Sequence, residues 1–174
     1  MASVTDKATG ATAEGAEARS LLAAHGIHHE YWDVSSLTES LRTRYDLPKA
    51  EQEKDILGHF ASQLDRISQQ RGYLARDLIV LSPNTPNIEE MLVNFVREHH
   101  HTEDEVRFIV DGEGVFTVQR DGQWFEILVR AGDLIAVPAG TRHWFTLTES
   151  RHVKAVRLFQ DPAGWVAIYD EASA

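Results

Sequence analysis

After Gly72 the chain consists of short apolar stretches that Gly, Pro and Asp interrupt at regular intervals. The stretches read ARDLIVLSP, NIEEMLVNFVRE, EVRFIVDGEGVFTVQRDGQWFEILVRAGDLIAVPAG, HWFTLTE and HVKAVRLF. Apolar runs of this length, bounded by turn residues, are typical of an all-β fold. We therefore expect roughly seven or eight strands between residues 77 and 168, closing into a small barrel or a two-sheet roll.

Glycine positions locate the expected turns of this β region. Asp121 and Gly122 predict a two-residue hairpin, because both central positions of that turn need positive φ. Asp111 with Gly112, and later Gly132, indicate further turns.

The N-terminal part has a different texture. Residues 1–16 carry almost no large apolar side chain, which predicts a flexible tail. From Ala16, EARSLLAAHG predicts a short helix that ends at Gly26, and IHHEYWDV alternates like a strand. We expect residues 17–174 to form one domain, with a helical part at 17–72 and a β-barrel at 73–169.

One long helix is expected from about Pro48 to Arg71, with Asp46 as its cap and Gly72 just beyond its end. Its apolar residues recur at helical spacing and predict a core-facing stripe: Ile56, Leu57, Phe60, Leu64 and Ile67.

Composition narrows the chemistry. The chain has no cysteine, so disulfide scaffolds, iron–sulfur clusters and thiol nucleophiles are excluded, and a metal site must use histidine and carboxylate. A net charge of -10 opposes binding to nucleic acid or anionic membranes. With no secretory signal and no apolar run long enough for a bilayer, we expect a cytoplasmic protein.

The histidines are clustered. On an extended chain, side chains two residues apart share a face, so His99 and His101 point the same way. Glu105 has the same parity and joins them if a tight turn at 102–104 preserves the register, and His143 can come from a later strand. The other six histidines are expected to be surface or structural residues: His25, His28, His29, His59, His100 and His152.

Three imidazoles and one carboxylate suit a divalent transition metal such as iron, nickel, cobalt or manganese. An octahedral ion with these four donors keeps two open positions for substrate oxygens or dioxygen. Zinc is less suitable because it prefers four ligands and does no redox work.

The spacing of these residues resembles the two metal-binding motifs of the cupin superfamily. The first motif runs from His99 to Gly112 and the second from Gly132 to His143. Val93 and Leu147 stand where the cupin motifs usually have Gly and Asn, and neither is a ligand. The resemblance implies a mainly β fold, the cupin double-stranded β-helix or jelly-roll barrel, with flanking N-terminal helices.

Longer segments are similar to the acireductone dioxygenase family: LIVLSPNTPNIEEMLVNFVREH, EHHHTEDEVRFIVDGEGVF, AGDLIAVPAGTRHWFTL and KAVRLFQDPAGW. This resemblance implies a methionine-salvage enzyme that cleaves acireductone, 1,2-dihydroxy-3-oxo-5-(methylthio)pent-1-ene, with O2. An Fe²⁺ form gives 4-methylthio-2-oxobutanoate and formate, and a Ni²⁺ form gives 3-(methylthio)propanoate, formate and CO. It also implies one Fe²⁺ or Ni²⁺ per monomer, bound by His99, His101, Glu105 and His143.

The substrate loses protons readily, so a positive site would favour its anion. Arg107 shares the parity of Glu105, and Arg157 can add a second charge, although each could instead form a structural ion pair. Candidates for an apolar pocket are Phe95, Trp144 and Phe145, which could equally be core residues.

Other readings stay open. Neither Glu98 nor Glu103 is a clear general base. The chain could be a different metal-dependent cupin dioxygenase or isomerase, or a cupin that binds a ligand without turnover. Resemblance and acidic charge favour a monomer that acts on a small molecule and O2.

Overall fold

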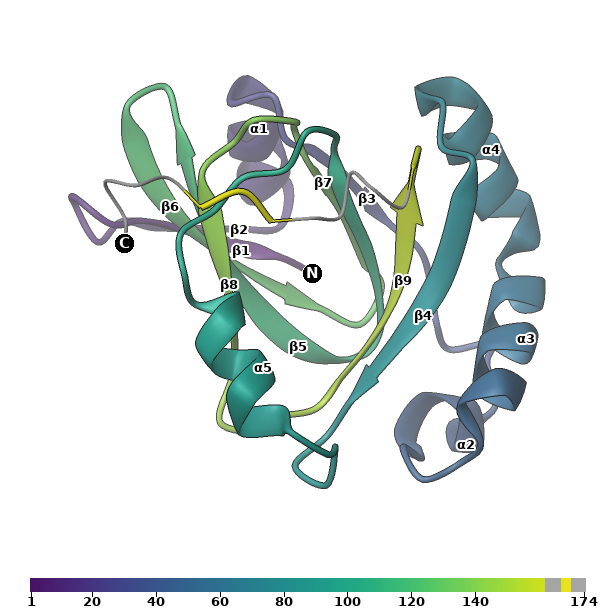
Figure 1. Cartoon of the computed structure of the whole chain (residues 1–174). Coiled ribbons are helices and arrows are strands. Elements are labelled where there is room, and N and C mark those ends of the chain that lie inside the picture. Colours follow the sequence, from purple (N-terminus) through teal and green to yellow (C-terminus); the bar gives the residue numbers. More distant parts are fainter. Residues whose placement is uncertain (162–166, 170–174) are drawn as a thin grey trace.

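The computed structural model describes residues 1–161 and 167–169 (Figure 1). One long strand, β5 (Glu105–Arg120), takes part in both of its β-sheets. This strand is 16 residues long. Its first half pairs with β7 (Asp133–Val137) and β9 (Val153–Phe159), and its second half pairs with β6 (Gln123–Arg130) and β8 (His143–Leu147). Because β5 belongs to both sheets, the sheets curl around a common interior.

The remaining strands extend these two sheets. β4 (Ala75–Leu81) pairs with β9, and β3 (His28–Tyr31) pairs with β7. β1 (Ser3–Asp6) pairs with β6 on one side and β2 (Thr12–Glu14) on the other. All of these pairings are antiparallel, and the predicted mainly β fold with flanking helices is confirmed.

Turn chemistry explains part of this topology. Asp121 (φ 53°) and Gly122 (φ 76°) both adopt positive φ between β5 and β6, which confirms the predicted hairpin. The prediction of a turn at Asp111 and Gly112 is wrong, because β5 continues through both residues with a β-bulge between Ile109 and Asp111. A Cβ on Gly112 would lie 2.0 Å from the backbone oxygen of His152, so glycine lets the strand bend there against its neighbour.

The expectation of a flexible tail over residues 1–16 is wrong. These residues form β1, β2 and the start of α1 (Gly15–Ala24), and Ala2 and Val4 are buried. The Ala2 N–H donates to the buried Asp133 carboxylate at 3.0 Å. Small side chains are sufficient here because pairing with β6 supplies backbone hydrogen bonds that local composition does not reveal.

The single helix expected over 48–71 is also wrong. The structure has α3 (Lys49–His59) and α4 (Ala61–Arg71), separated at Phe60. The buried ring of Phe60 packs on Phe108 with centroids 4.8 Å apart, and this contact with the sheet lies at the break. Asp46 does not cap the helix, because its carboxylate accepts from Arg44 instead.

The secondary structure expected directly after β4 is wrong as well. The segment NIEEMLVNF was expected to belong to the β region, but the structure places helix α5 there (Ile88–Phe95). Its apolar residues at spacings of three and four pack against the barrel interior: Ile88, Met91, Leu92 and Phe95. This helix and the continuity of β5 leave six strands after residue 75 in the described part of the chain, rather than seven or eight.

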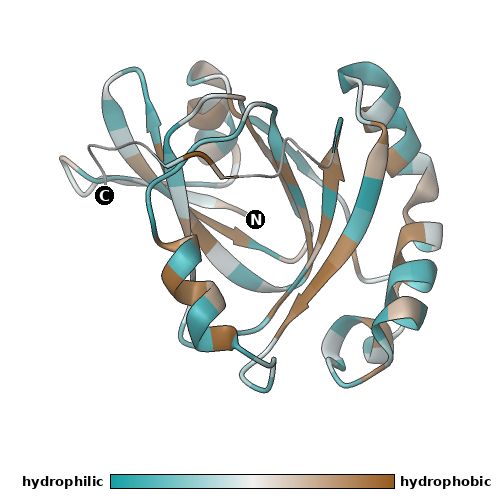
Figure 2. Ribbon diagram, viewed as in Figure 1, coloured by the Kyte–Doolittle hydropathy of each residue, from teal (hydrophilic) through white to brown (hydrophobic). Residues whose placement is uncertain are grey.

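Apolar side chains form two clusters on opposite faces of the curled sheet. One fills the barrel interior, and the other lies between the sheet and helices α3 and α4. Alternation along β5 separates them, since Ile109 belongs to the first cluster and Phe108 and Val110 to the second. Figure 2 shows hydrophobic colour on the strands, interrupted by pale and hydrophilic residues, and mixed colour on the helices.

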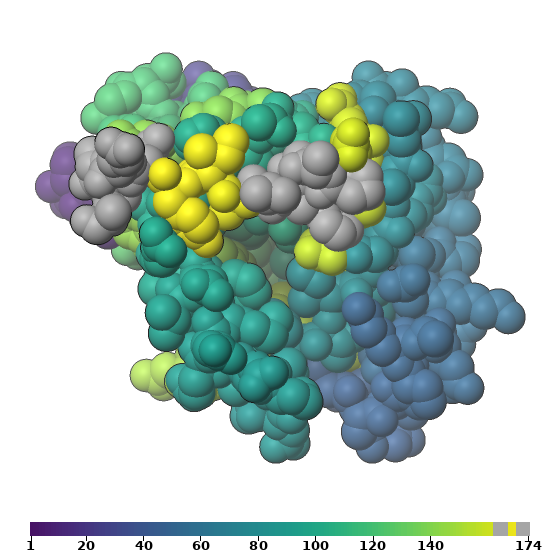
Figure 3. All heavy atoms as spheres, in the orientation of Figure 1, coloured from purple at the N-terminus to yellow at the C-terminus, as the bar shows by residue number. Residues whose placement is uncertain are grey.

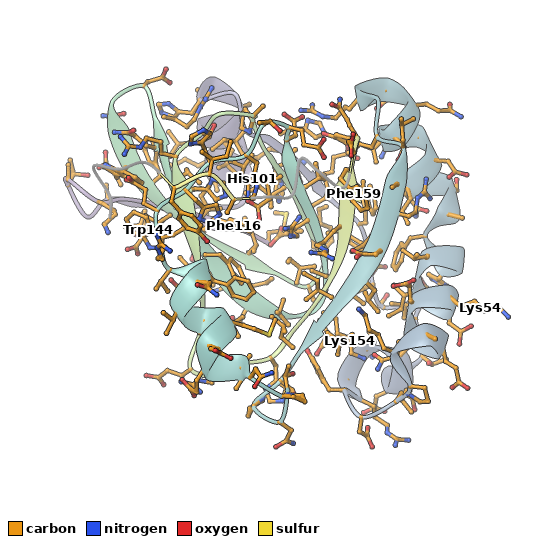
Figure 4. All side chains as sticks on the ribbon, in the orientation of Figure 1. Lys54, His101, Phe116, Trp144, Lys154 and Phe159 are labelled. Carbon is orange, nitrogen blue, oxygen red and sulfur yellow. The ribbon has the colours of Figure 1, made fainter. Side chains whose placement is uncertain are left out.

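A buried cation ties the helical layer to the sheet. Lys154 of β9 donates to the backbone oxygens of Leu41 and Arg44, at 2.8 and 2.5 Å, at the end of α2 (Glu39–Thr43) (Figure 4). Burial lowers the pKa of Lys154. In the described part of the chain, no helix combines the length and apolar character that crossing a bilayer requires.

Candidate metal centre

The metal site joins two distant parts of the chain. His99 and His101 precede β5, Glu105 begins it, and His143 begins β8. His99 and His143 form an isolated bridge in which each backbone N–H donates to the other's oxygen at 2.9 Å. This bridge fixes the relative position of the two motifs and brings their side chains to one end of the barrel interior.

Backbone oxygens orient two of the three imidazoles. The Nδ1 atom of His99 lies 2.6 Å from the oxygen of Arg97, and Nδ1 of His143 lies 2.7 Å from that of Thr141. Because each Nδ1–H is used as a donor, Nε2 of each ring faces the cluster. Nδ1 of His101 is buried and has no hydrogen-bond partner among the described residues.

The four ligand atoms fit one metal ion. One atom from each of His99, His101, Glu105 and His143 lies within 4.8 Å of the others. Opposite ligands on an octahedral ion are about 4.2 Å apart when the bonds are about 2.1 Å long. Nε2 of His101 and Nε2 of His143 both lie next to the same Glu105 oxygen, an arrangement that a cation between them stabilises.

Charge inside the site is balanced in pairs. Burial alone would raise the pKa of Glu105, but the charges of Arg107 and His143 hold this pKa well below its usual range. Arg107 lies 3.0 Å from Glu105, and burial lowers the pKa of this arginine. Arg157 donates two hydrogen bonds to Asp77, at 2.7 and 2.5 Å. The site therefore holds two guanidinium groups beside the metal ligands.

A cavity of about 500 Å³ extends from the ligands toward the surface, where Figure 3 shows a hollow between α5 and β4. Figure 4 shows His101 and Phe116 inside the barrel. Apolar side chains make up most of its lining: Ile79, Val80, Leu81, Met91, Phe95, Ile109, Phe116, Phe145, Val153 and Ala155. Such a cavity can take a small molecule that has an anionic head and an apolar tail.

The structure separates the three aromatic candidates. Phe95 and Phe145 line the cavity. Trp144 does not line it, and its ring packs on that of Trp124 with centroids 5.0 Å apart (Figure 4 labels Trp144). Placing Trp144 in the pocket is therefore wrong. Neighbouring residues on a strand face opposite sides, so His143 and Phe145 point inward and Trp144 points outward.

The structure gives contacts to three acidic residues near the site, of which Asp77 was not identified from the sequence. Asp77 of β4 holds Arg157, and an acidic residue inside the apolar run ARDLIVL was the available signal. The carboxylate of Glu103 accepts the N–H groups of Gln160 and Asp161 at 2.9 and 3.1 Å, so it anchors the chain after β9. Glu98 pairs with Arg142 at 2.6 Å.

Comparison with known proteins agrees with this geometry. Residues 24–167 match the model of the ARD/ARD' family. The acireductone dioxygenase of Bacillus subtilis is 48% identical over 158 residues, which cover 90% of this chain and 88% of that protein. That of Sulfurihydrogenibium sp. is 44% identical over 155 residues, or 89% and 86% of the two chains.

A solved structure is similar over nearly the whole fold. Acireductone dioxygenase from Bacillus anthracis, with a cadmium ion in its active center, has a TM-score of 0.93 and 42% identity over 97% of this chain and 98% of that one. Fold, ligand cluster and relatives together define a metal-dependent dioxygenase of the cupin superfamily. The chain belongs to the ARD/ARD' family, the acireductone dioxygenases.

Proposed function

We propose that this chain binds Fe²⁺ or Ni²⁺ through His99, His101, Glu105 and His143 and cleaves acireductone with O2. The observation that carries the proposal is the placement of this ligand cluster beside two arginines in an apolar cavity. The family supplies the substrate class, since the relatives are acireductone dioxygenases.

The donor set suits this choice of metal. Three imidazole nitrogens and one carboxylate oxygen are ligands that both Fe²⁺ and Ni²⁺ accept. An ion held by these four residues would supply Lewis-acid and redox chemistry for the reaction of the substrate with O2. The Fe²⁺ form is expected to yield 4-methylthio-2-oxobutanoate and formate, and the Ni²⁺ form 3-(methylthio)propanoate, formate and CO.

The two arginines bind and hold the ionised head of the substrate. Arg107 and Arg157 line the same cavity as the metal ligands, and arginine side chains are the permanent cations of proteins. A guanidinium group donates charge-assisted hydrogen bonds to enediolate oxygens, which stabilises the anion. Glu105 and Asp77 position these groups before the substrate arrives.

The apolar part of the cavity accepts the methylthio tail. The rings of Phe95 and Phe145 lie 6.2 Å apart, and Phe145 also contacts Phe116 at 4.9 Å. Burial of a thioether among these rings is favourable by the hydrophobic effect and by sulfur–aromatic contact. The tail therefore orients the enediol head toward the metal ligands.

We also propose that the protein acts as a monomer in the cytoplasm, in methionine salvage. Its substrate is small and diffusible, and a net charge of -10 opposes self-association. Light scattering coupled to size-exclusion chromatography should give the mass of one chain, 19.6 kDa.

Reconstitution tests the reaction. The protein is stripped of metal, loaded with Fe²⁺ or Ni²⁺, and mixed with acireductone while oxygen uptake and products are measured. Oxygen uptake and formate are expected with both metals, and CO with nickel alone. Absence of turnover with either metal would overturn the proposal.

Metal analysis of variants tests the ligand set separately. His99→Ala and His143→Ala should lose the bound metal. His59→Ala is the matched control, because His59 lies on α3 and its ring bonds Ser36 at 2.8 Å. Full metal content in His99→Ala and His143→Ala would show that the assigned ligands are wrong.

A further inference from the structure

Helix α3 lies beside the edge strand β4, which pairs only with β9 among the described strands. The carboxylate of Glu53 accepts the N–H of Leu78 at 3.2 Å and so covers part of this edge. Lys49 precedes Glu53 by four residues and therefore lies on the same face of the helix, one turn earlier. It lines the cavity together with Val80 of β4.

The helix dipole does not explain the position of Lys49. Lys49 is the first residue of α3, where the partial positive charge of the helix N-terminus favours an acidic side chain such as Glu51. Its side chain is exposed, and within the described residues no ion pair involves it. A lysine is thus placed where the helix dipole disfavours it.

The distribution of charge around the cavity indicates a role for Lys49 in attracting an anion. The protein carries a net charge of -10, which repels an anionic substrate at long range. Inside the cavity, Arg107 and Arg157 are paired with Glu105 and Asp77. Apart from these arginines and the metal ligands, Lys49 is the charged residue of the described lining.

We propose that Lys49 attracts the anionic enediolate into the cavity and so raises the rate of substrate association. This inference rests on the proposed function, because it takes acireductone as the ligand. A charge at the mouth acts during encounter and is left behind when the substrate head reaches Arg107 and Arg157. Lys49 therefore influences kcat/KM and the association rate constant, and leaves kcat unchanged.

Charge reversal at Lys49 provides the test. The Ni²⁺-loaded protein is mixed with acireductone without oxygen, and association is followed by the ultraviolet absorbance of the enediolate. At low ionic strength, Lys49→Glu should lower the association rate constant and kcat/KM by about three- to fivefold, and Lys49→Arg should retain both. The deficit should vanish at about 1 M salt, where the Debye length falls to about 3 Å.

Lys54→Glu is the matched control. Lys54 lies on the same helix, and its side chain points away from the barrel in Figure 4, so the substitution changes net charge equally without altering the cavity. Its association rate should stay within about 1.5-fold of the unsubstituted protein. Lys49→Glu should change the Tm little, because an acidic residue suits the helix N-terminus, which offsets the like charge of Glu53 four residues away.

Three results would overturn the inference. Equal effects of Lys49→Glu and Lys54→Glu would show that only net charge matters. A fall in kcat as large as the fall in kcat/KM would place Lys49 in the chemical step instead. If the unsubstituted protein neither binds acireductone nor consumes oxygen, the proposed function fails and this inference fails with it.

Discussion

Arg107 of β5 and Arg157 of β9 lie directly opposite each other in the sheet, and both line the cavity. Like charges on facing strand positions destabilise a sheet. Here each guanidinium has its own carboxylate, Glu105 for Arg107 and Asp77 for Arg157. The sheet thus holds two positive charges side by side, in an arrangement suited to an anionic ligand.

Removing one of these ion pairs should separate binding from stability. In Asp77→Asn/Arg157→Met, kcat/KM should fall about 10- to 100-fold, because a charge-assisted hydrogen bond to the substrate is lost. Metal content and Tm should not fall, because the double substitution leaves no unpaired charge and removes the repulsion between Arg157 and Arg107. The control is Asp65→Asn/Arg76→Met, an ion pair at 2.9 Å that also involves β4. Unchanged kcat/KM in the first variant would contradict a role for Arg157 in binding.

Two glycine substitutions should have opposite effects on stability. A Cβ at Gly114 would lie 2.3 Å from the ring of Phe145, so Gly114→Ala should destabilise the protein by about 1–3 kcal/mol. Gly58 lies within α3 with nothing near its Cβ position, so Gly58→Ala should stabilise by about 0.5–1 kcal/mol. Urea unfolding measures both values, and the same sign for both would contradict this account.

Adjacent aromatic residues on β8 should differ in function. Phe145→Ala should raise KM for acireductone, because the ring lines the cavity. Trp144→Ala should leave KM unchanged and lower stability by about 1 kcal/mol through loss of the contact with Trp124. Steady-state kinetics and thermal unfolding separate the two effects. A raised KM in Trp144→Ala would show that its outward orientation has been misjudged.

Glu30 should contribute stability that depends on pH. Burial alone would raise its pKa, but hydrogen bonds from Arg66, His28 and Trp32 lower it to about 2. Since the unfolded chain has a pKa near 4.5, this contribution is complete above pH 4.5 and is lost as the pH falls toward 2. The difference in unfolding free energy between the unsubstituted protein and Glu30→Gln should shrink over that interval. A difference that is constant from pH 7 to pH 3 would exclude this linkage.

Sequence alone was sufficient for the features that depend on a few neighbouring residues. Asp121 and Gly122 identified a hairpin, because the required φ angles are a property of those two positions. The alternation of His99 and His101, with Glu105 at the same parity beyond a turn at 102–104, predicted that these three side chains lie together, as they do in the cluster with His143. The mainly β fold followed from the same local rules.

Pairing between distant segments determined the rest. Within residues 1–16, β1 and β2 form because β6 offers an edge, and NIEEMLVNF is a helix because the barrel interior accepts its apolar face. The same dependence holds at the site. Asp77 reaches Arg157 across β4 and β9, and Lys49 reaches the cavity because α3 lies beside β4. Contacts of this kind depend on packing energies summed over the whole molecule, so patterns among neighbouring residues in the sequence do not predict them.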